Sequence, residues 1–445
     1  MRLEEYREKG LGGLFDESGS EPGYSLKEII ALNDDRSLPC KERCEFVNAL
    51  IEEVEDYLSD IMMEEEKDDD GMSMVGIPVE GESNFEKEVR RNAILPLESI
   101  SAAYGWVGTI HLNPTSCMTE IHPREGISPS SIKADSEKIA AAMGVDPAST
   151  RIYIKGNNVA VEIPRAFPEG LDFWDSLECQ DAIDCKGLPL ALGADYFTRN
   201  VIEDLTECQD ILIAGASRQG KSNCIRSMID SILYFNGPDR IRFAMFDPTG
   251  SEFSVYNGLR KDYFFGGGVI SDEDRAMQML RDLHEETESR RRMLTESHCR
   301  DINEFLENGG SLPYIALFID EFAYLSLGEN GKEFRKLIND LARKGRTAGI
   351  HCVIATGRPC SDVITGDIKV SFPCRIAFKV PSRVESMTVL DCTGAEKLLG
   401  PGDMLVMKGF DIRRIQGGRE DPENTEKLVA YVNRKHIAED ALKIL

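Results

Sequence analysis

Eight residues near the middle of the chain have the types and spacing of a phosphate-binding loop, GxxxxGK[ST]. They are Gly215, Ala216, Ser217, Arg218, Gln219, Gly220, Lys221 and Ser222. An apolar run, Ile211–Ile213, precedes the loop, and a helix is predicted to follow it from Lys221 to Leu233. In such a loop the backbone N–H groups and the helix N-terminus face the phosphates, the lysine reaches the β and γ oxygens, and the serine hydroxyl binds Mg²⁺. The loop therefore predicts a site for ATP and Mg²⁺.

Two acidic residues, Asp320 and Glu321, end an apolar run that begins at Tyr314, about 100 residues after the loop. We expect Asp320 to hold Mg²⁺ and Glu321 to polarise the water that attacks the phosphate. Adjacent side chains on a strand face opposite ways. The two roles therefore require Glu321 to lie beyond the strand, where the chain bends.

The elements that must position these residues alternate between apolar runs and amphipathic stretches from Leu188 onward. This alternation predicts an α/β fold with a mostly parallel sheet covered on both faces. The expected core strands are Asp210–Ala214, Ile241–Phe246, Tyr314–Ile319, His351–Ala355 and Arg375–Val380. The chain should end in one or two helices between Glu423 and Leu445.

Two further regions precede this core. Residues 93–185 are predicted to form a small α/β domain, with strands at Thr109–Leu112, Arg151–Ile154 and Val159–Ile163 and a helix at Ser131–Met143. Residues 1–92 are predicted to be an acidic accessory region with an amphipathic helix at Cys40–Met63. The motor domain would then span 186–445.

The composition indicates a globular protein of the cytoplasm. The chain has 445 residues, and 41% of them are hydrophobic, without any run long enough to cross a bilayer. Its 12 cysteines show no regular spacing, which favours free thiols. We therefore expect no membrane insertion.

The charge is unevenly distributed. The net charge is -26, and residues 1–90 alone contain 26 acidic and 10 basic side chains. Between Arg335 and Arg383 the balance reverses, with 10 lysines and arginines against three aspartates. This basic island predicts an anionic partner bound over a small area.

The motifs resemble those of the FtsK/SpoIIIE DNA translocases, in the order and spacing of that family over about residues 188–410. The matching segments, besides the phosphate loop, are Leu188–Gly193, Asp247-Pro248 with Glu252–Tyr256, Phe318–Ala323, Arg346–His351, Thr356 with Arg358-Pro359, Asp362–Gly366 and Gly394–Leu405. Weaker similarity reaches upstream to Ile127–Ile163. The resemblance implies a RecA-like P-loop NTPase core and a homo-hexameric ring around double-stranded DNA.

The resemblance also implies roles for single residues. Arg346 matches the arginine finger that a neighbouring subunit inserts at the transferring phosphate. Thr356 matches the sensor position at the end of a core strand. Three further residues match segments that face the central channel, where they would contact phosphates: Arg358, Lys369 and Arg383.

Several positions depart from the family pattern. The loop interior is Ala-Ser-Arg-Gln in place of Thr-Thr-Gly-Ser, and Gly357, Thr249 and Met387 stand where the family carries glutamine, lysine and arginine. The family's membrane anchor and sequence-reading winged-helix module are not expected here. The leading hypothesis is an ATP-driven translocase of double-stranded DNA, with residues 1–92 as a site for a protein partner. The alternatives are a secretion-type ATPase that moves protein, or a ring scaffold that hydrolyses ATP weakly.

Overall fold

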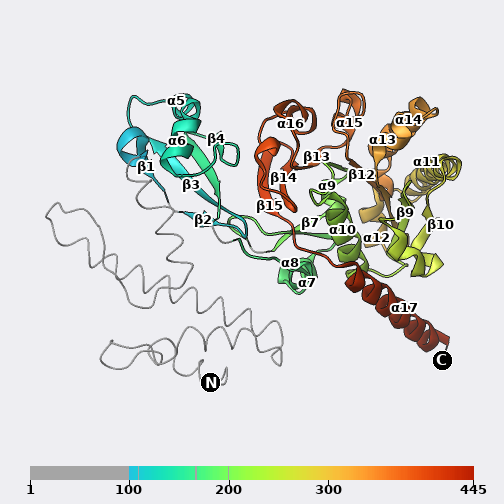
Figure 1. Cartoon of the computed structure of the whole chain (residues 1–445). Helices are drawn as coiled ribbons and strands as arrows, with labels where there is room; N and C mark the ends of the chain where they lie inside the picture. Colours follow the sequence, from blue (N-terminus) through green and yellow to red (C-terminus); the bar gives the residue numbers. More distant parts are fainter. Residues whose placement is uncertain (1–99, 109, 166–167, 199, 445) are drawn as a thin grey trace, which may run out of the picture. The chain divides into compact units, whose positions relative to one another are not determined.

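A computed structural model describes residues 100–108, 110–165, 168–198 and 200–444, with side chains up to Arg434 (Figure 1). These residues lie in a compact unit, Glu82–Leu445. The helix expected at Cys40–Met63 and the acidic region 1–92 lie outside the described residues. The predicted domain boundaries at residues 92 and 185 stay predictions.

The first part of the described chain forms a small antiparallel sheet backed by two helices. Its strands are β1 (Gly105–Val107), β2 (His111–Leu112), β3 (Ser116–Pro123), β4 (Arg151–Lys155) and β5 (Asn158–Pro164), in the order β1-β3-β5-β4 with β2 paired to β3. The helix expected at Ser131–Met143 is in fact two, α5 (Pro129–Ala134) and α6 (Ser136–Ala142). Asp135 caps the end of one and the start of the next, which divides the helix. Ile132 and Ile139, one from each helix, pack in the same apolar core.

A connecting segment leads to the large sheet. It contains the short helices α7 (Phe173–Leu177), α8 (Gln180–Asp184) and α9 (Leu205–Cys208) and the two-stranded sheet of β6 (Pro189–Gly193) and β7 (Val201–Asp204).

The large sheet has eight strands in the order β10-β9-β11-β12-β8-β13-β14-β15. They are β8 (Ile211–Ala214), β9 (Ile241–Phe246), β10 (Phe264–Ile270), β11 (Tyr314–Ile319), β12 (Ile350–Thr356), β13 (Cys374–Phe378), β14 (Asp403–Lys408) and β15 (Asp411–Gln416). The pairings from β10 to β13 are parallel, and those of β14 are antiparallel. The expected α/β class and mostly parallel sheet are therefore confirmed, while β10, β14 and β15 were not predicted.

Both faces of this sheet are buried. Along β8, Ile211 and Ile213 pack in one core with α10 (Lys221–Phe235), whereas Leu212 and Ala214 pack in the other. Successive strand residues point to opposite faces, so a strand buried on both sides must be apolar throughout. The other helices are α11 (Glu273–Glu296), α12 (Ile302–Glu307), α13 (Phe322–Ser326), α14 (Gly331–Lys344), α15 (Gly366–Ser371), α16 (Arg383–Leu390) and α17 (Pro422–Ile444), with the 3₁₀ turns η2 (Ser254–Gly258), η3 (Lys261–Tyr263), η4 (Arg346–Ala348) and η5 (Ala395–Lys397).

A buried ion-pair group joins the small sheet to the large one. Arg414 of β15 lies 3.0 Å from Glu162 of β5 and 2.7 Å from Asp403 of β14. Arg151 of β4 contacts the other oxygen of Glu162 at 2.8 Å. Since all four side chains are almost fully buried, each charge depends on its partners in this group.

Among the described residues, none of the helices combines the length and the apolar character that crossing a bilayer requires.

Candidate nucleotide-binding site

The phosphate loop connects the end of β8 to the start of α10. Its backbone is clamped on two sides, because Ala216 donates its N–H to the Lys379 carbonyl at 2.9 Å and Gln219 accepts from the Gly402 N–H at 3.0 Å. Gly220 has a φ of 109°, and a Cβ there would lie 2.7 Å from the Gly402 nitrogen. Position 220 therefore requires glycine.

The interior of the loop carries one strained residue. Arg218 has a φ of 62°, in the left-handed region that non-glycine residues avoid. This is the loop position at which the FtsK/SpoIIIE pattern has glycine. The departure noted in the sequence thus has a conformational cost of roughly 1 kcal/mol.

Lys221, the first residue of α10, points back to the loop. Its Nζ donates to the Ala216 carbonyl at 2.9 Å. Burial lowers the pKa of Lys221 below its ordinary value. The carboxylates of Glu321, Asp320 and Glu252 act in the opposite direction. The lysine is therefore the cation of an otherwise acidic group of side chains.

Asp320 directly follows β11 at the same edge of the sheet. Burial, followed by the negative charges of neighbouring carboxylates, raises the pKa of Asp320 to about 7. Those neighbours are Glu252, Asp247 and Glu321, and Lys221 opposes them.

This donor set fits Mg²⁺, which prefers oxygen ligands such as carboxylates and hydroxyls. The charged form of Asp320 is disfavoured by burial and by its acidic neighbours, and a divalent cation would favour it. Ser222 lies in the first turn of α10, next to the lysine. Asp320 and Ser222 are thus the candidates to hold Mg²⁺ together with ATP.

Glu321 lies where the chain bends after β11. Its backbone is left-handed, with φ 55° and ψ 64°, and α13 begins directly after it. Oε1 accepts from the Thr356 hydroxyl at 3.0 Å, and Oε2 accepts from the Gly357 N–H at 3.0 Å. β11 and β12 are parallel neighbours, which brings Thr356 beside the glutamate. The carboxylate is therefore held in one orientation by two donors from the next strand end.

Gly357 lies close to both Glu321 and Lys221. A Cβ at this position would be 3.0 Å from Glu321 Oε2 and 3.8 Å from Lys221 Nζ. The glutamine of the family pattern would thus place its side chain between Glu321 and Lys221. Glycine has no side chain there and contributes only its backbone N–H to Glu321.

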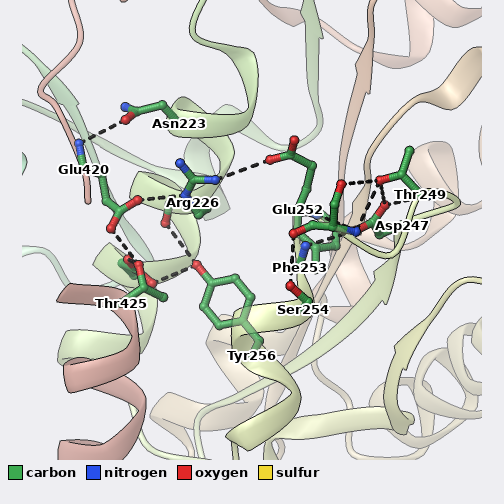
Figure 2. Close-up of polar contacts among 12 residues, drawn as sticks. Asn223, Arg226, Asp247, Thr249, Glu252, Phe253, Ser254, Tyr256, Glu420 and Thr425 are labelled. Carbon is green, nitrogen blue, oxygen red and sulfur yellow. Dashed lines mark hydrogen bonds and ion pairs between the residues drawn. The ribbon is translucent and has the colours of Figure 1, made fainter. Parts of the chain in front are cut away.

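Asp247 and Glu252 have no role predicted from the sequence, and the structure brings both to the strand ends near Asp320. Asp247 follows β9, and its carboxylate accepts from the Thr249 hydroxyl and from backbone N–H groups, including those of Glu252 at 2.7 Å and Phe253 at 3.1 Å (Figure 2). Burial raises the pKa of Asp247, but these hydrogen bonds outweigh it and hold the pKa below its ordinary value. The carboxyl ends of parallel strands lie on the same side of a sheet, so an acid directly after a predicted strand is a signal that it belongs to the site.

Arg346 lies at the opposite ends of the strands, on the amino-terminal side of β12. It opens η4, just before β12, whereas Thr356 ends that strand of seven residues. At about 3.3 Å per residue the two ends are about 20 Å apart. The Arg346 side chain is exposed. Within one subunit the structure therefore does not bring Arg346 to the phosphate loop.

The three candidate DNA contacts follow β12 in the chain. Arg358 is exposed and has no hydrogen bond or ion pair from its side chain to the part of the chain that the structure describes. Lys369 of α15 pairs with Asp391 at 2.5 Å, and the exposed Arg383, which begins α16, lies 3.7 Å from Glu396. Two of these three charges are thus shared with carboxylates.

Comparison with known proteins gives relatives that are named DNA translocases FtsK and SpoIIIE. DNA translocase FtsK of Borreliella burgdorferi is 34% identical over 362 residues, which cover 79% of this chain and 46% of the relative. DNA translocase SpoIIIE of Bacillus subtilis is 33% identical over 371 residues, with coverage of 79% and 46%. The chain thus spans about half the length of these curated relatives.

Solved structures agree in fold. The conjugation coupling protein TcpA of pCW3, in its monomer form with ATPγS, has a TM-score of 0.54 at 22% identity and covers 77% of this chain and 99% of its own. The cytoplasmic domain of the type VII secretion ATPase EccC of Thermomonospora curvata has a TM-score of 0.51 at 19% identity, covering 59% and 34%. The model of the FtsK/SpoIIIE family matches residues 182–361, which include the phosphate loop, Asp320 and Glu321. The chain therefore carries a P-loop ATPase domain that belongs to the FtsK/SpoIIIE family.

Proposed function

We propose that this chain hydrolyses ATP to move along double-stranded DNA, as a homo-hexameric ring in the cytoplasm. One observation carries the proposal. Thr356 and Gly357 fix Glu321 at the strand ends where Lys221 and Asp320 also lie. This arrangement is what in-line attack of water on a bound γ-phosphate requires.

The proposed roles follow from the contacts. Lys221 would exchange its bond to the neutral Ala216 carbonyl for bonds to the charged β and γ oxygens. Glu321 would orient and polarise the attacking water. Mg²⁺, held by Ser222 and Asp320, would neutralise charge on the phosphate oxygens.

The proposed ring rests partly on Arg346. This residue is exposed at the sheet edge away from its own phosphate loop. If Arg346 contacts a phosphate, that phosphate must be bound by a neighbouring subunit, as an arginine finger requires.

DNA as the substrate is supported by the names of the relatives and by three cations on consecutive elements. Arg358 follows β12, Lys369 lies in α15 and Arg383 begins α16; the two arginines are exposed and Lys369 is half-buried. Phosphate contacts of this kind track the backbone without reading sequence.

The test measures ATP turnover with and without duplex DNA. Glu321→Gln should bind ATP but lose about 100-fold or more in kcat, since it removes the general base. Arg346→Ala should also be inactive. A mixture of the two variants should regain turnover, because a subunit with intact Glu321 can then meet a neighbour with intact Arg346. Inactive mixtures of co-assembled variants would contradict action between subunits.

The DNA contacts are tested by Arg358→Ala, with Arg300→Ala as the control. Arg300 is an exposed arginine whose only ion pair is with Glu304 in the part of the chain described. Loss of DNA-stimulated turnover in the first variant alone supports the proposal. Turnover independent of DNA would favour a motor for protein, and ATP binding without turnover would favour a weakly hydrolysing ring scaffold.

Residues 1–92 are proposed to bind a protein partner, on the strength of their separate acidic charge. Deleting them should change the partner profile while the ATPase remains active.

A further inference from the structure

Arg226 links the nucleotide-binding edge to the C-terminal segment. It lies on α10, one helical turn after Ser222. Its guanidinium is 3.3 Å from Glu252 and 2.8 Å from Glu420, which precedes α17 (Figure 2). One cation thus joins a loop beside Lys221 and Asp320 to the start of the last helix.

Behind Glu420 lies a buried oxygen cluster, formed by Tyr256, Asp230, Thr425 and Glu420. The Tyr256 hydroxyl is 2.8 Å from Asp230 Oδ1. The Thr425 hydroxyl is 2.6 Å from Asp230 Oδ2 and 2.7 Å from Glu420 Oε1. All four residues are buried, from three parts of the chain: α10, η2 and the region 420–425. The cluster therefore fastens the start of α17 to α10.

The cluster contains too few hydroxyl hydrogens for its contacts. Each of the three short O···O contacts needs a hydrogen, and the two hydroxyl groups supply one each. With both carboxylates ionised, one contact would set lone pairs against lone pairs in a buried site. A carboxyl proton is thus required.

The charges around the cluster decide which carboxyl carries it. Glu420 pairs with the Arg226 guanidinium at 2.8 Å, so a cation lies beside its negative charge. From the described residues, the donors to Asp230 are the hydroxyls of Tyr256 and Thr425, and the negative charge of Glu420 opposes ionisation of Asp230. In agreement, burial raises the pKa of Asp230 to about 7.

We propose that Asp230 holds a proton when the start of α17 is fastened to α10, and that loss of this proton loosens the fastening. After deprotonation, two buried anions face one threonine hydrogen. Arg226 is then the single cation that faces the cluster from the described elements packed against it. Arg226 is drawn toward these anions and away from Glu252. Loss of the Asp230 proton therefore weakens a contact of Glu252, which lies near Lys221 and Asp320.

The sign of the pH dependence follows. In the opened segment Asp230 has an ordinary pKa near 4, whereas in the closed cluster it is near 7. The closed form therefore holds one more proton between these values, and opening becomes easier as the pH rises through this window. From about pH 5 to about pH 7 the opening constant should increase roughly 50-fold, and it should change little above pH 8.

Hydrogen–deuterium exchange of residues 418–434 in the full chain, corrected for intrinsic rates, tests this. The wild type should show the increase, and Asp230→Asn, which keeps a neutral donor toward Thr425, should not. Thr425→Ser retains the hydroxyl and should behave as wild type. An equal pH response in wild type and Asp230→Asn overturns the proposal.

If Asp230→Asn does not fold, a second measurement that keeps Asp230 tests the proposal. Infrared difference spectra of Asp320→Asn, which lacks the other carboxyl with a pKa raised to about 7, should show a buried protonated carboxylic acid that ionises near pH 7. The absence of such a band between about pH 5 and about pH 8 also overturns the proposal.

Discussion

The hydroxyl of Thr356 offers the sharpest test of how the proposed general base is held. Thr356 is fully buried at the end of β12, and its Oγ1 donates to Glu321 at 3.0 Å. Thr356→Val removes this donor at nearly constant volume. The Gly357 N–H remains at 3.0 Å, so Glu321 keeps one anchor and loses orientation rather than position.

The magnitude follows from the charge on the acceptor. A hydrogen bond to a charged group contributes about 1.5–3 kcal/mol. If the whole bond acts on the transition state, this corresponds to a loss of between about tenfold and about 100-fold in kcat. The remaining Gly357 donor places the expectation near the lower end. KM for ATP should change little, because the hydroxyl contacts neither the phosphate loop nor Lys221.

Steady-state ATPase rates with duplex DNA measure the effect, and Thr356→Ser is the matched control because it keeps the donor. The reasoning is refuted by a valine variant within twofold of wild type. It is also refuted if serine and valine lose activity equally.

Three further predictions concern the loop, a buried base and the ion-pair group between the two sheets. Arg218→Gly should bind ATP at least as tightly as wild type, and Arg218→Val roughly tenfold more weakly, in calorimetric titrations, because glycine is unstrained at this φ of 62° and a β-branched residue is more strained there than arginine. His351 is buried with a pKa lowered to about 4, mainly by burial, so its imidazole binds more protons in the unfolded form between about pH 4 and 6.5. Its contribution to stability should fall by about 3 kcal/mol as the pH drops through that window, opposite in sign to the contributions of Asp230 and Asp320, and the difference in urea unfolding between the wild type and His351→Asn isolates it. Arg414→Met should cost about 3–5 kcal/mol in urea unfolding, since it leaves Glu162 and Asp403 buried with one cation fewer.

The parallel core of the fold could be predicted because burial on both faces leaves a direct sequence signal. The observed strands Ile241–Phe246 and Tyr314–Ile319 coincide with the predicted ones. The unpredicted β15 reads Asp-Ile-Arg-Arg-Ile-Gln, and its central arginine pair contacts Asp195 and Glu162, which are 218 and 252 residues away. Those partners come from the tertiary fold, so the local pattern could not indicate a strand.

The same division applies to the site. The phosphate loop and the acids after β11 are local motifs, and the structure brings them to one edge of the sheet. What holds Glu321 is not local, because its donors are 35 and 36 residues away. The position of Arg346, far from the phosphate loop of its own subunit, likewise depends on the direction of β12. Sequence spacing alone does not give that direction.

The basic island shows how folding changes a charge count. In the sequence, residues 335–383 carry 10 cations against three aspartates. In the fold, Asp391 pairs with both Lys369 and Arg375, and Glu396 lies beside Arg383. Both acids come from just beyond the counted window. A duplex would therefore compete with carboxylates for these cations, which weakens each phosphate contact. Arg358 has no such competitor in the described chain, so its loss should lower DNA affinity more than the loss of Lys369.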